Sequence, residues 1–104
     1  MKLLTKEIRE KLPKLYAQDK KGDDAVVYAK FFTPWTKWTW FVTEFDGEDT
    51  FFGLVQGHET EAGYFSLSEL EAIKGPFGLK IERDMHFSPK TLGEIKKGLA
   101  ARSA

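Results

Sequence analysis

Residues 37–56 read KWTWFVTEFDGEDTFFGLVQ, and this stretch decides the fold. Two runs rich in aromatic and β-branched residues, 37–45 and 50–56, flank the sequence Asp46-Gly47-Glu48-Asp49. Aromatic and β-branched residues favour strands, and a glycine between two such runs supplies the positive φ that a tight turn needs. The stretch therefore predicts an antiparallel β-hairpin.

Further strand-like segments lie on both sides of this hairpin. Residues 25–32 form a run that Thr33-Pro34 ends, a short strand is expected at 63–65, and another is expected at 79–82. Strands that follow one another without long crossovers pair as an antiparallel meander. We therefore expect a meander of about four to five strands.

Three helices are expected around the meander. Thr5 is a suitable N-cap for a first helix, and Pro13 should end that helix because it lacks an N–H group. Two capping boxes, Ser66-Leu67-Ser68-Glu69 and Thr91-Leu92-Gly93-Glu94, predict a short middle helix and a C-terminal helix. Helices packed on an antiparallel sheet give an α+β fold, and 104 residues suit a single domain over residues 1–104.

The composition limits the chemistry and the compartment. There is no cysteine, which excludes a disulfide scaffold, a thiolate nucleophile and a thiolate-bound metal. The N-terminus becomes charged after two leucines, so we expect no secretory signal, and no run approaches the ~18 apolar residues of a membrane span. We therefore expect a cytoplasmic protein without a membrane anchor or a cofactor.

Charge is distributed unevenly, although the formal net charge is zero. No lysine or arginine occurs between Lys37 and Lys74, and the flanks hold all sixteen basic residues. The acidic residues of that window are Glu44, Asp46, Glu48, Asp49, Glu59, Glu61, Glu69 and Glu71. A zero net charge gives no general case for nucleic-acid or membrane binding, so the local pattern carries more information.

Several longer motifs together resemble one bacterial family. They are Lys30-Phe31-Phe32-Thr33-Pro34, Trp38-Thr39-Trp40, Thr43-Glu44-Phe45-Asp46, Phe51-Phe52-Gly53-Leu54-Val55, Gly63-Tyr64-Phe65-Ser66-Leu67 with Glu69-Leu70, and Gly75-Pro76-Phe77-Gly78-Leu79 with Glu82-Arg83-Asp84. Over residues 1 to about 90, the chain resembles the family catalogued as domain of unknown function 2958. The resemblance implies a short bacterial protein associated with mobile elements such as plasmids. It implies no activity, cofactor or catalytic residue.

The three tryptophans are candidates for binding. In an extended strand, Trp38, Trp40 and Val42 share one face, and the odd-numbered residues from 39 to 45 share the other. Large side chains on both faces indicate a core on each side of the strand. A partly open face would instead let the tryptophans stack a base or dock a peptide. We expect Trp35 to be exposed, because it lies in a proline-bounded loop.

The acidic residues Glu44, Asp46, Glu48 and Asp49 gather at a strand end and at the hairpin turn. Such a cluster is ordinary in a solvated turn. As a functional hypothesis, the cluster forms a negative surface that meets a basic protein partner or mimics a phosphate backbone, as an anti-defence protein would.

Two smaller groups complete the candidate sites. His58, Glu59 and Glu61 form a weak candidate for a Mg²⁺ or Mn²⁺ site, without the second histidine of a zincin helix. Arg83, beside Asp84, either belongs to an internal ion pair or points at a phosphate or carboxylate ligand. No nucleophile elbow, phosphate loop or catalytic triad is recognisable, so no catalytic residue is assigned.

The first and last helices carry basic residues that would form one surface if both helices lay on the same side of the sheet. These residues are Lys6, Arg9, Lys11 and Lys14 in the first, and Lys96, Lys97 and Arg102 in the last. A joint surface of this kind would follow a phosphate backbone. Separate surfaces would be the solvated polar faces of two amphipathic helices.

The function that we expect first is that of a non-enzymatic binding protein of a bacterial mobile element, acting through contact with a protein partner. Nucleic-acid binding through aromatic and basic residues is the alternative. A metal-dependent hydrolase or nuclease is the third hypothesis. The sequence leaves the identity of the partner open.

Overall fold

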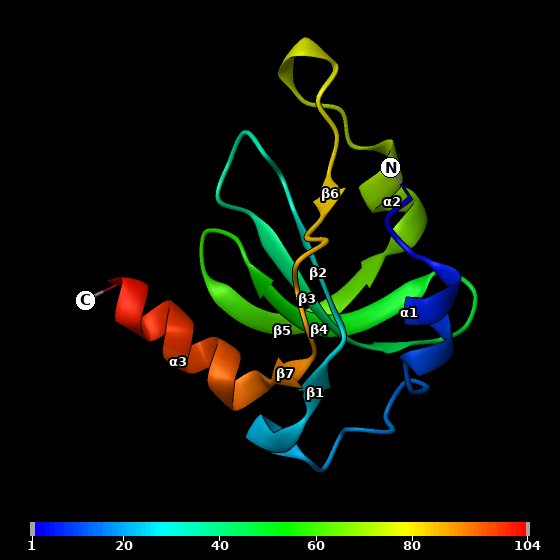
Figure 1. Cartoon of the computed structure of the whole chain (residues 1–104), viewed down its shortest axis with the longest axis vertical. Coiled ribbons are helices and arrows are strands. Elements are labelled where there is room, and N and C mark those ends of the chain that lie inside the picture. The colour runs from blue at the N-terminus through cyan, green and yellow to red at the C-terminus, as the bar shows by residue number, and fades with distance from the viewer. Residues whose placement is uncertain (1, 104) are drawn as a thin grey trace.

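The computed structural model describes residues 2–103 and has the predicted α+β architecture, with helices around an antiparallel sheet (Figure 1). The strands are β1 (Val26–Val27), β2 (Ala29–Phe32), β3 (Thr39–Phe45), β4 (Thr50–Gln56), β5 (Thr60–Ser66), β6 (Glu82–Arg83) and β7 (Lys90–Thr91). The helices are α1 (Lys6–Lys11), α2 (Leu67–Ala72) and α3 (Leu92–Ser103), with the 3₁₀ turns η1 (Gly22–Asp24) and η2 (Pro76–Gly78). No helix within residues 2–103 is long and apolar enough to cross a membrane.

The main sheet has the strand order β5-β4-β3-β2-β6, and every neighbouring pair is antiparallel. Strands β2 to β5 form the predicted meander, because each connects to the next by a short loop. Strand β6 comes from a later part of the chain and pairs with the outer edge of β2. Within residues 2–103, the main sheet therefore has five strands, which agrees with the expected four to five.

Several strand boundaries differ from the predicted ones. The strand expected over 25–32 is divided at Tyr28, because β1 pairs with β7 in a separate two-stranded sheet. Strand β5 is longer than the predicted 63–65, and the strand expected over 79–82 begins only at Glu82. Short strands depend on partners distant in the chain, so local propensity does not fix their ends.

The β3–β4 hairpin forms as its sequence predicts. Gly47 has a φ of 91°, and the Asp46 carboxylate accepts hydrogen bonds from the amides of residues 48–50 at distances from 2.8 to 3.0 Å. Arg9 of α1 donates a further hydrogen bond from Nη1 to the Gly47 carbonyl at 2.8 Å. The turn is therefore organised by its own side chains and attached to the first helix.

A β-bulge interrupts the pairing of β3 with β4. Val42 pairs with Gly53, but Glu44 pairs with Phe52, so the register shifts by one residue between them. Phe45 consequently packs in the same core as Val42, although strict alternation predicts that it faces the other way. The prediction for Phe45 is wrong because a one-residue shift reverses every side chain beyond it.

Both faces of β3 are buried, as the large side chains on its two faces predict. One core lies between the sheet and the helices α1 and α2, and its buried residues are Leu3, Leu4, Ala29, Phe31, Trp40, Val42, Phe45, Phe51, Leu70 and Ile81. The other core lies under α3, and its buried residues are Val27, Phe41, Leu54 and Ile95. All seven residues of β3 are therefore buried, and α1 and α3 pack on opposite faces.

The predicted helix caps form. The Thr5 hydroxyl accepts a hydrogen bond from the Ile8 amide at 3.2 Å, and α1 ends at Lys11, before Pro13. At α3, the Thr91 hydroxyl accepts from the Glu94 amide at 3.2 Å, and the Glu94 carboxylate accepts from the Thr91 amide at 3.1 Å. These reciprocal bonds complete the capping box that the sequence predicts.

Gly53 of β4 pairs with Val42, next to the bulge, and a Cβ at Gly53 would collide with the backbone carbonyl of Phe41. We expect Gly53→Ala to lower the free energy of unfolding by about 2 kcal/mol or more, because backbone rather than a flexible side chain must move. In thermal unfolding this corresponds to a fall in the midpoint of roughly 10 °C.

Gly63→Ala is the matched control on the neighbouring strand β5, because a Cβ at Gly63 meets nothing within 4 Å. Its unfolding midpoint should stay close to that of the unmodified chain. Equal midpoints for the two variants would contradict the close approach at the bulge.

Candidate functional site

The three tryptophans lie in different environments. Trp40 is a core residue, 7% exposed, and Trp38 is half-buried beside it with 5.9 Å between the ring centroids. Trp38 also contacts the His58 ring edge-on at 5.6 Å. Trp35, which we expected to be exposed, is half-buried because its ring lies on the backbone of Gly75. The structure therefore places Trp35 against Gly75, in the segment between α2 and β6.

Glu44, predicted as part of an acidic surface, instead points into the protein. Glu44 is only 4% exposed. One carboxylate oxygen accepts a hydrogen bond from the Tyr16 amide and the other from the Gln18 amide, both at 2.8 Å. Glu44 therefore positions the segment 16–18 and does not join the acidic residues of the hairpin turn.

Asp46, Glu48 and Asp49 do lie together in the turn, but the carboxylates of Asp46 and Asp49 accept hydrogen bonds from backbone amides. The Asp49 carboxylate accepts hydrogen bonds from the Ser66 hydroxyl at 2.6 Å, from the Ser68 hydroxyl at 2.7 Å and from the Ser68 amide at 2.8 Å. The Ser66 hydroxyl lowers the pKa of Asp49 most, and the amide of Glu48 is the main cause that lowers the pKa of Asp46. The turn is thereby fastened to the start of α2.

The weak metal candidates lie around the turn between β4 and β5. His58 and Glu59 are exposed there, and Glu61 follows at the start of β5. Among residues 2–103, no three histidine or acidic side chains are close enough together to hold a metal ion. The predicted Mg²⁺ or Mn²⁺ site therefore has no ligand set within the described part of the chain.

Arg83 attaches the N-terminal segment to the sheet. Its Nη1 donates hydrogen bonds to the carbonyl oxygen of Leu3 at 3.3 Å and to that of Lys2. The neighbouring Asp84 forms an ion pair with Lys30 of β2 at 3.7 Å. These hydrogen bonds to main-chain carbonyls give Arg83 a structural role, but they are not the internal ion pair that the sequence offers as one alternative.

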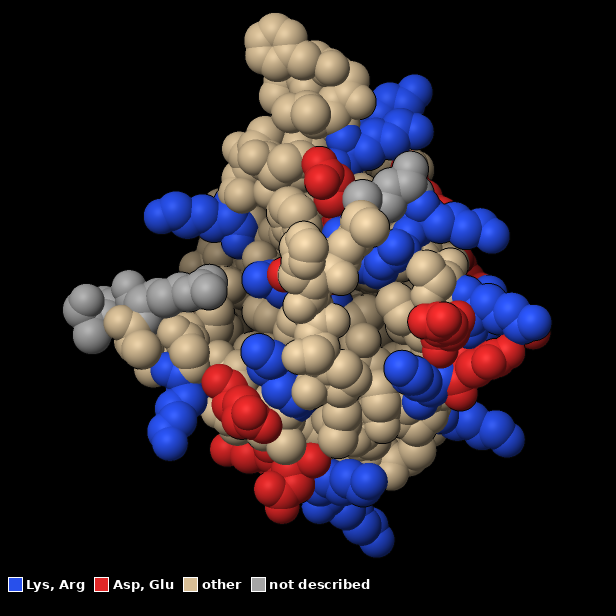
Figure 2. All heavy atoms as spheres, in the orientation of Figure 1, with Lys and Arg blue, Asp and Glu red and all other residues tan. Residues whose placement is uncertain are grey.

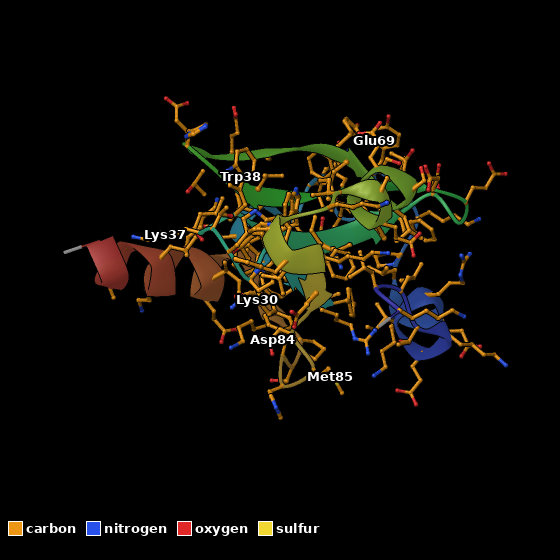
Figure 3. The ribbon with its side chains drawn as sticks, turned by 90° about the horizontal axis from the view of Figure 1, so that it is seen from above. Lys30, Lys37, Trp38, Glu69, Asp84 and Met85 are labelled. Carbon is orange, nitrogen blue, oxygen red and sulfur yellow. The ribbon has the colours of Figure 1, made fainter. Side chains whose placement is uncertain are left out.

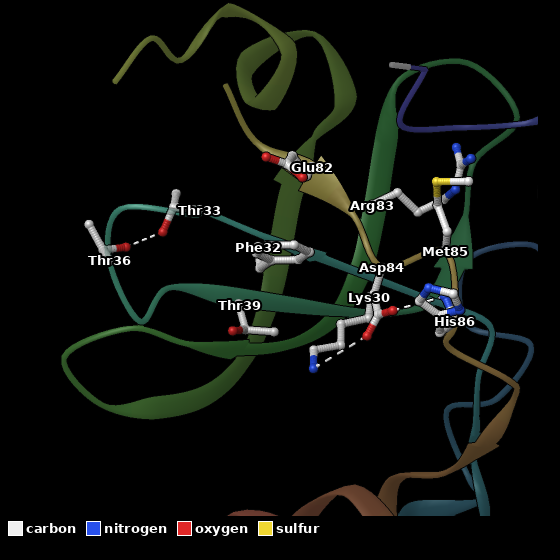
Figure 4. A pocket seen from close by; sticks show the side chains of 10 residues that line it. All are labelled: Lys30, Phe32, Thr33, Thr36, Thr39, Glu82, Arg83, Asp84, Met85 and His86. Carbon is white, nitrogen blue, oxygen red and sulfur yellow. Dashed lines mark hydrogen bonds and ion pairs between the residues drawn. The ribbon is translucent and has the colours of Figure 1, made fainter. Parts of the chain in front are cut away.

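A groove of about 460 Å³, which we call the β6 groove, lies along β6 and the loop between β2 and β3 (Figure 4). Its lining residues are Lys30, Phe32, Thr33, Thr36, Thr39, Glu82, Arg83, Asp84, Met85 and His86. Lys30 of β2 and Asp84, which directly follows β6, lie close together (Figure 3). Asp84 also accepts a hydrogen bond from the His86 amide at 2.9 Å. The groove therefore combines both signs of charge with a row of hydroxyl groups.

The loop of residues 73–80, which we call the Phe77 loop, projects from the molecule between α2 and β6 (Figure 1). Figure 2 shows the tip of this loop as an uncharged projection, with basic and acidic side chains near its base. Phe77 at its tip is 100% exposed, and Ile73 and Leu79 of the same loop are also exposed. A large apolar side chain in water adds nothing to a core, so this exposure points to binding.

The backbone holds Phe77 in a strained conformation. Its φ of 57° and ψ of 28° lie in the left-handed region, which costs a residue with a side chain about 1–2 kcal/mol. The Gly75 amide donates to the Leu79 carbonyl at 2.7 Å, and the Trp35 ring supports Gly75. The loop is therefore braced and presents Phe77 in a fixed position.

The basic residues of α1 and α3 do not form one surface, because the two helices pack on opposite faces of the sheet. Arg9 is bonded to the hairpin turn, and Lys96 pairs with Asp23 at 2.8 Å. The side chain of Arg102 lies outside the described residues. The condition for a joint phosphate-binding surface is therefore not met by these two helices.

Sequence reasoning did not select Phe77 as a site. Its signal is a large apolar residue between Pro76 and Gly78, in a segment whose composition predicts a solvent-facing turn. Trp35 was selected for a related reason, because it also follows a proline in a loop. In the structure Trp35 and Phe77 belong to one site, because Trp35 supports the loop that carries Phe77.

Residues 3–97 match the model of a family described as protein of unknown function (DUF2958). The matched region includes the whole main sheet, the β6 groove and the Phe77 loop. Neither the curated proteins nor the solved structures provide a match to this chain. The site must therefore be interpreted from its own geometry.

The hydrogen bonds to Asp49 predict how stability depends on pH. They lower its pKa in the folded chain, so its ionised form adds stability that is present above the unfolded pKa of ~4 and is lost as pH falls through the folded pKa. We expect Asp49→Asn to lower the unfolding midpoint at pH 7. Between about pH 5 and 2, the midpoint of this variant should fall less steeply than that of the unmodified chain.

Glu48→Gln is the control for Asp49→Asn, because Glu48 is the exposed neighbour in the same turn. Its unfolding midpoint, followed by circular dichroism across the same pH range, should track the unmodified chain. An unchanged pH profile for Asp49→Asn would show that the bonds to Ser66 and Ser68 do not fasten the turn to α2.

Proposed function

We propose that this chain, which belongs to the family described as protein of unknown function (DUF2958), is a non-enzymatic binding protein that acts through protein–protein contacts. The family resemblance supports a bacterial mobile element as its setting, and the N-terminal sequence, which becomes charged after two leucines, supports the cytoplasm as its compartment. The Phe77 loop supports the mode of action, and its fully exposed phenylalanine is the observation that carries the proposal.

The chemistry of Phe77 suits a binding anchor. Burying a phenylalanine side chain is worth about 2–3 kcal/mol, and this gain is not used within the chain itself. Aromatic anchors that fill a partner's pocket dominate many interfaces. Since the loop is already braced by the Gly75–Leu79 hydrogen bond and by Trp35, little ordering cost would oppose association.

The surroundings of the loop supply the polar rim that such an interface needs. Thr33 and Thr36 line the β6 groove, while Trp35 of the same short loop supports Gly75. The groove and the Phe77 loop are therefore joined through one segment of the chain. A protein seated on Phe77 would place polar groups over the groove, as interfaces with an apolar centre and a hydrated rim do.

The other two functions receive less support. Nucleic-acid binding would use the basic residues of α1 and α3, but these helices lie on opposite faces of the sheet. A metal-dependent hydrolase or nuclease would need a group of ligands, and no such group of three occurs within residues 2–103. Nucleic-acid binding remains an outcome that the binding experiment below can reveal.

The proposal predicts the behaviour of Phe77→Asn. Asparagine adopts positive φ more readily than phenylalanine, so the variant should be at least as stable as the unmodified chain in thermal unfolding. When each chain is immobilised and exposed to a lysate of the host, the unmodified chain should retain the partner protein and Phe77→Asn should not. The measurement is quantitative mass spectrometry of the retained proteins, with losses of roughly tenfold or more expected for the partner.

Lys20→Ala is the control, because Lys20 is also exposed but lies in neither the Phe77 loop nor the β6 groove. This variant should retain the same protein as the unmodified chain. A partner held equally well by Phe77→Asn would overturn the proposal. Retention of DNA or RNA that is abolished by moderate salt would favour the nucleic-acid alternative instead.

A further inference from the structure

A second exposed aromatic site lies on the side of the sheet that α3 covers. Tyr16 and Tyr64 are 66% and 55% exposed, and the Tyr64 hydroxyl donates a hydrogen bond to the Tyr16 hydroxyl at 3.3 Å. Phe52 packs against Tyr64 with 4.9 Å between the ring centroids. Together with Leu92 and Lys96 of α3, they line a groove of about 380 Å³, which we call the tyrosine groove.

The backbone under Tyr16 is built for this exposure. Tyr16 has a φ of 73°, and with Phe77 it is one of two residues other than glycine with positive φ within residues 2–103. The buried Glu44 carboxylate accepts hydrogen bonds from the amides of Tyr16 and Gln18. Gln18 is only 5% exposed, and its side chain forms hydrogen bonds with the backbone of Val26 and Thr43. The buried side chains of Glu44 and Gln18 therefore fix a strained turn, and this turn presents the Tyr16 ring to solvent.

The charge around the groove is predominantly negative. Asp19 and Glu44 line it, and the ammonium of Lys96 lies 2.8 Å from the Asp23 carboxylate. Among residues 2–103, two carboxylates and one ammonium therefore line the groove, and Asp23, outside the lining, is paired with that ammonium. The pKa of Tyr64 is raised, first by its hydrogen bond to Tyr16 and further by the negative charges of Glu44 and Asp19. A phosphate group would be repelled here, whereas a cation would be attracted.

We propose that the tyrosine groove binds an arginine side chain from a basic segment of a partner protein. Aromatic rings attract a guanidinium over their faces, and the nearby carboxylates add to that attraction. Strand β5, which carries Tyr64, is a terminal strand of the sheet, so an extended segment can run alongside it and place one side chain in the groove. The proposal does not depend on the Phe77 loop, with which the groove shares no residue.

The direct test is a nuclear magnetic resonance titration of the ¹⁵N-labelled full chain with the peptide Thr-Val-Arg-Val-Thr. A matched peptide with citrulline in place of arginine keeps the shape and removes the charge. We expect the arginine peptide to shift the amide signals of residues 16–19 and of Tyr64, and the citrulline peptide to bind at least fivefold more weakly. Equal binding of the two peptides, or shifts that map elsewhere, would overturn the proposal.

Variants of the groove separate binding from folding. Tyr16→Gly removes the ring at a position whose φ favours glycine, so its unfolding midpoint should equal or exceed that of the unmodified chain while its affinity falls roughly tenfold. Among residues 2–103, Lys96 is the cation that lines the groove; Lys96→Gln removes it and frees Asp23, so this variant should bind two- to threefold more tightly. Unchanged affinity in Tyr16→Gly, or weaker binding in Lys96→Gln, would contradict the assigned site.

The last arm of the test concerns the source of the cation. N-acetylarginine amide carries the same guanidinium group but has no extended peptide segment on either side of it. If the groove serves a protein segment, this compound should bind at least fivefold more weakly than the pentapeptide, because it cannot pair with β5. Equal affinities would mean that the groove takes a free organic cation, and the partner segment would then be rejected.

Discussion

The β-bulge between Val42 and Glu44 is the constraint on which the rest of the structure depends. It requires Gly53 on the opposite strand, because no side chain fits against the Phe41 carbonyl. By shifting the register, it sends Phe45 into the core under α1 and α2. The same shift takes Glu44 away from that core and lets it hold the turn at Tyr16. One extra residue in β3 thus serves both the core and the tyrosine groove.

Backbone strain and aromatic exposure coincide twice in this chain. Tyr16 and Phe77 both have positive φ, and both rings are mostly or fully in water. Neither residue recovers the cost of its conformation through burial, and glycine would satisfy the backbone at either position. Each turn is instead supported by other groups: Glu44 and Gln18 at one, Trp35 at the other. Strain of this kind concentrates where a surface is kept for binding.

Much of the fold follows from local sequence signals, and the parts that do not follow have specific causes. The hairpin, the caps at Thr5 and Thr91 and the two-sided burial of β3 are set by residues near in the chain, so they were predictable. The division of the strand at Tyr28 depends on β7, which lies far along the chain. In the candidate sites, the acidic cluster was predicted as one surface, yet Glu44 is directed inward because the bulge intervenes.

The sequence by itself determined the α+β class, the central hairpin and the list of aromatic and acidic residues from which sites are made. These properties arise from propensity, turn chemistry and alternation, which act over a few residues. Only the tertiary structure decided which of those residues reach solvent together. Trp35 supports the loop of Phe77, and Tyr16 contacts Tyr64. Both pairs are far apart in sequence, so no local sequence pattern could predict them. Packing made that choice, because a shift of one residue in a strand decides whether a side chain is buried or offered to a partner.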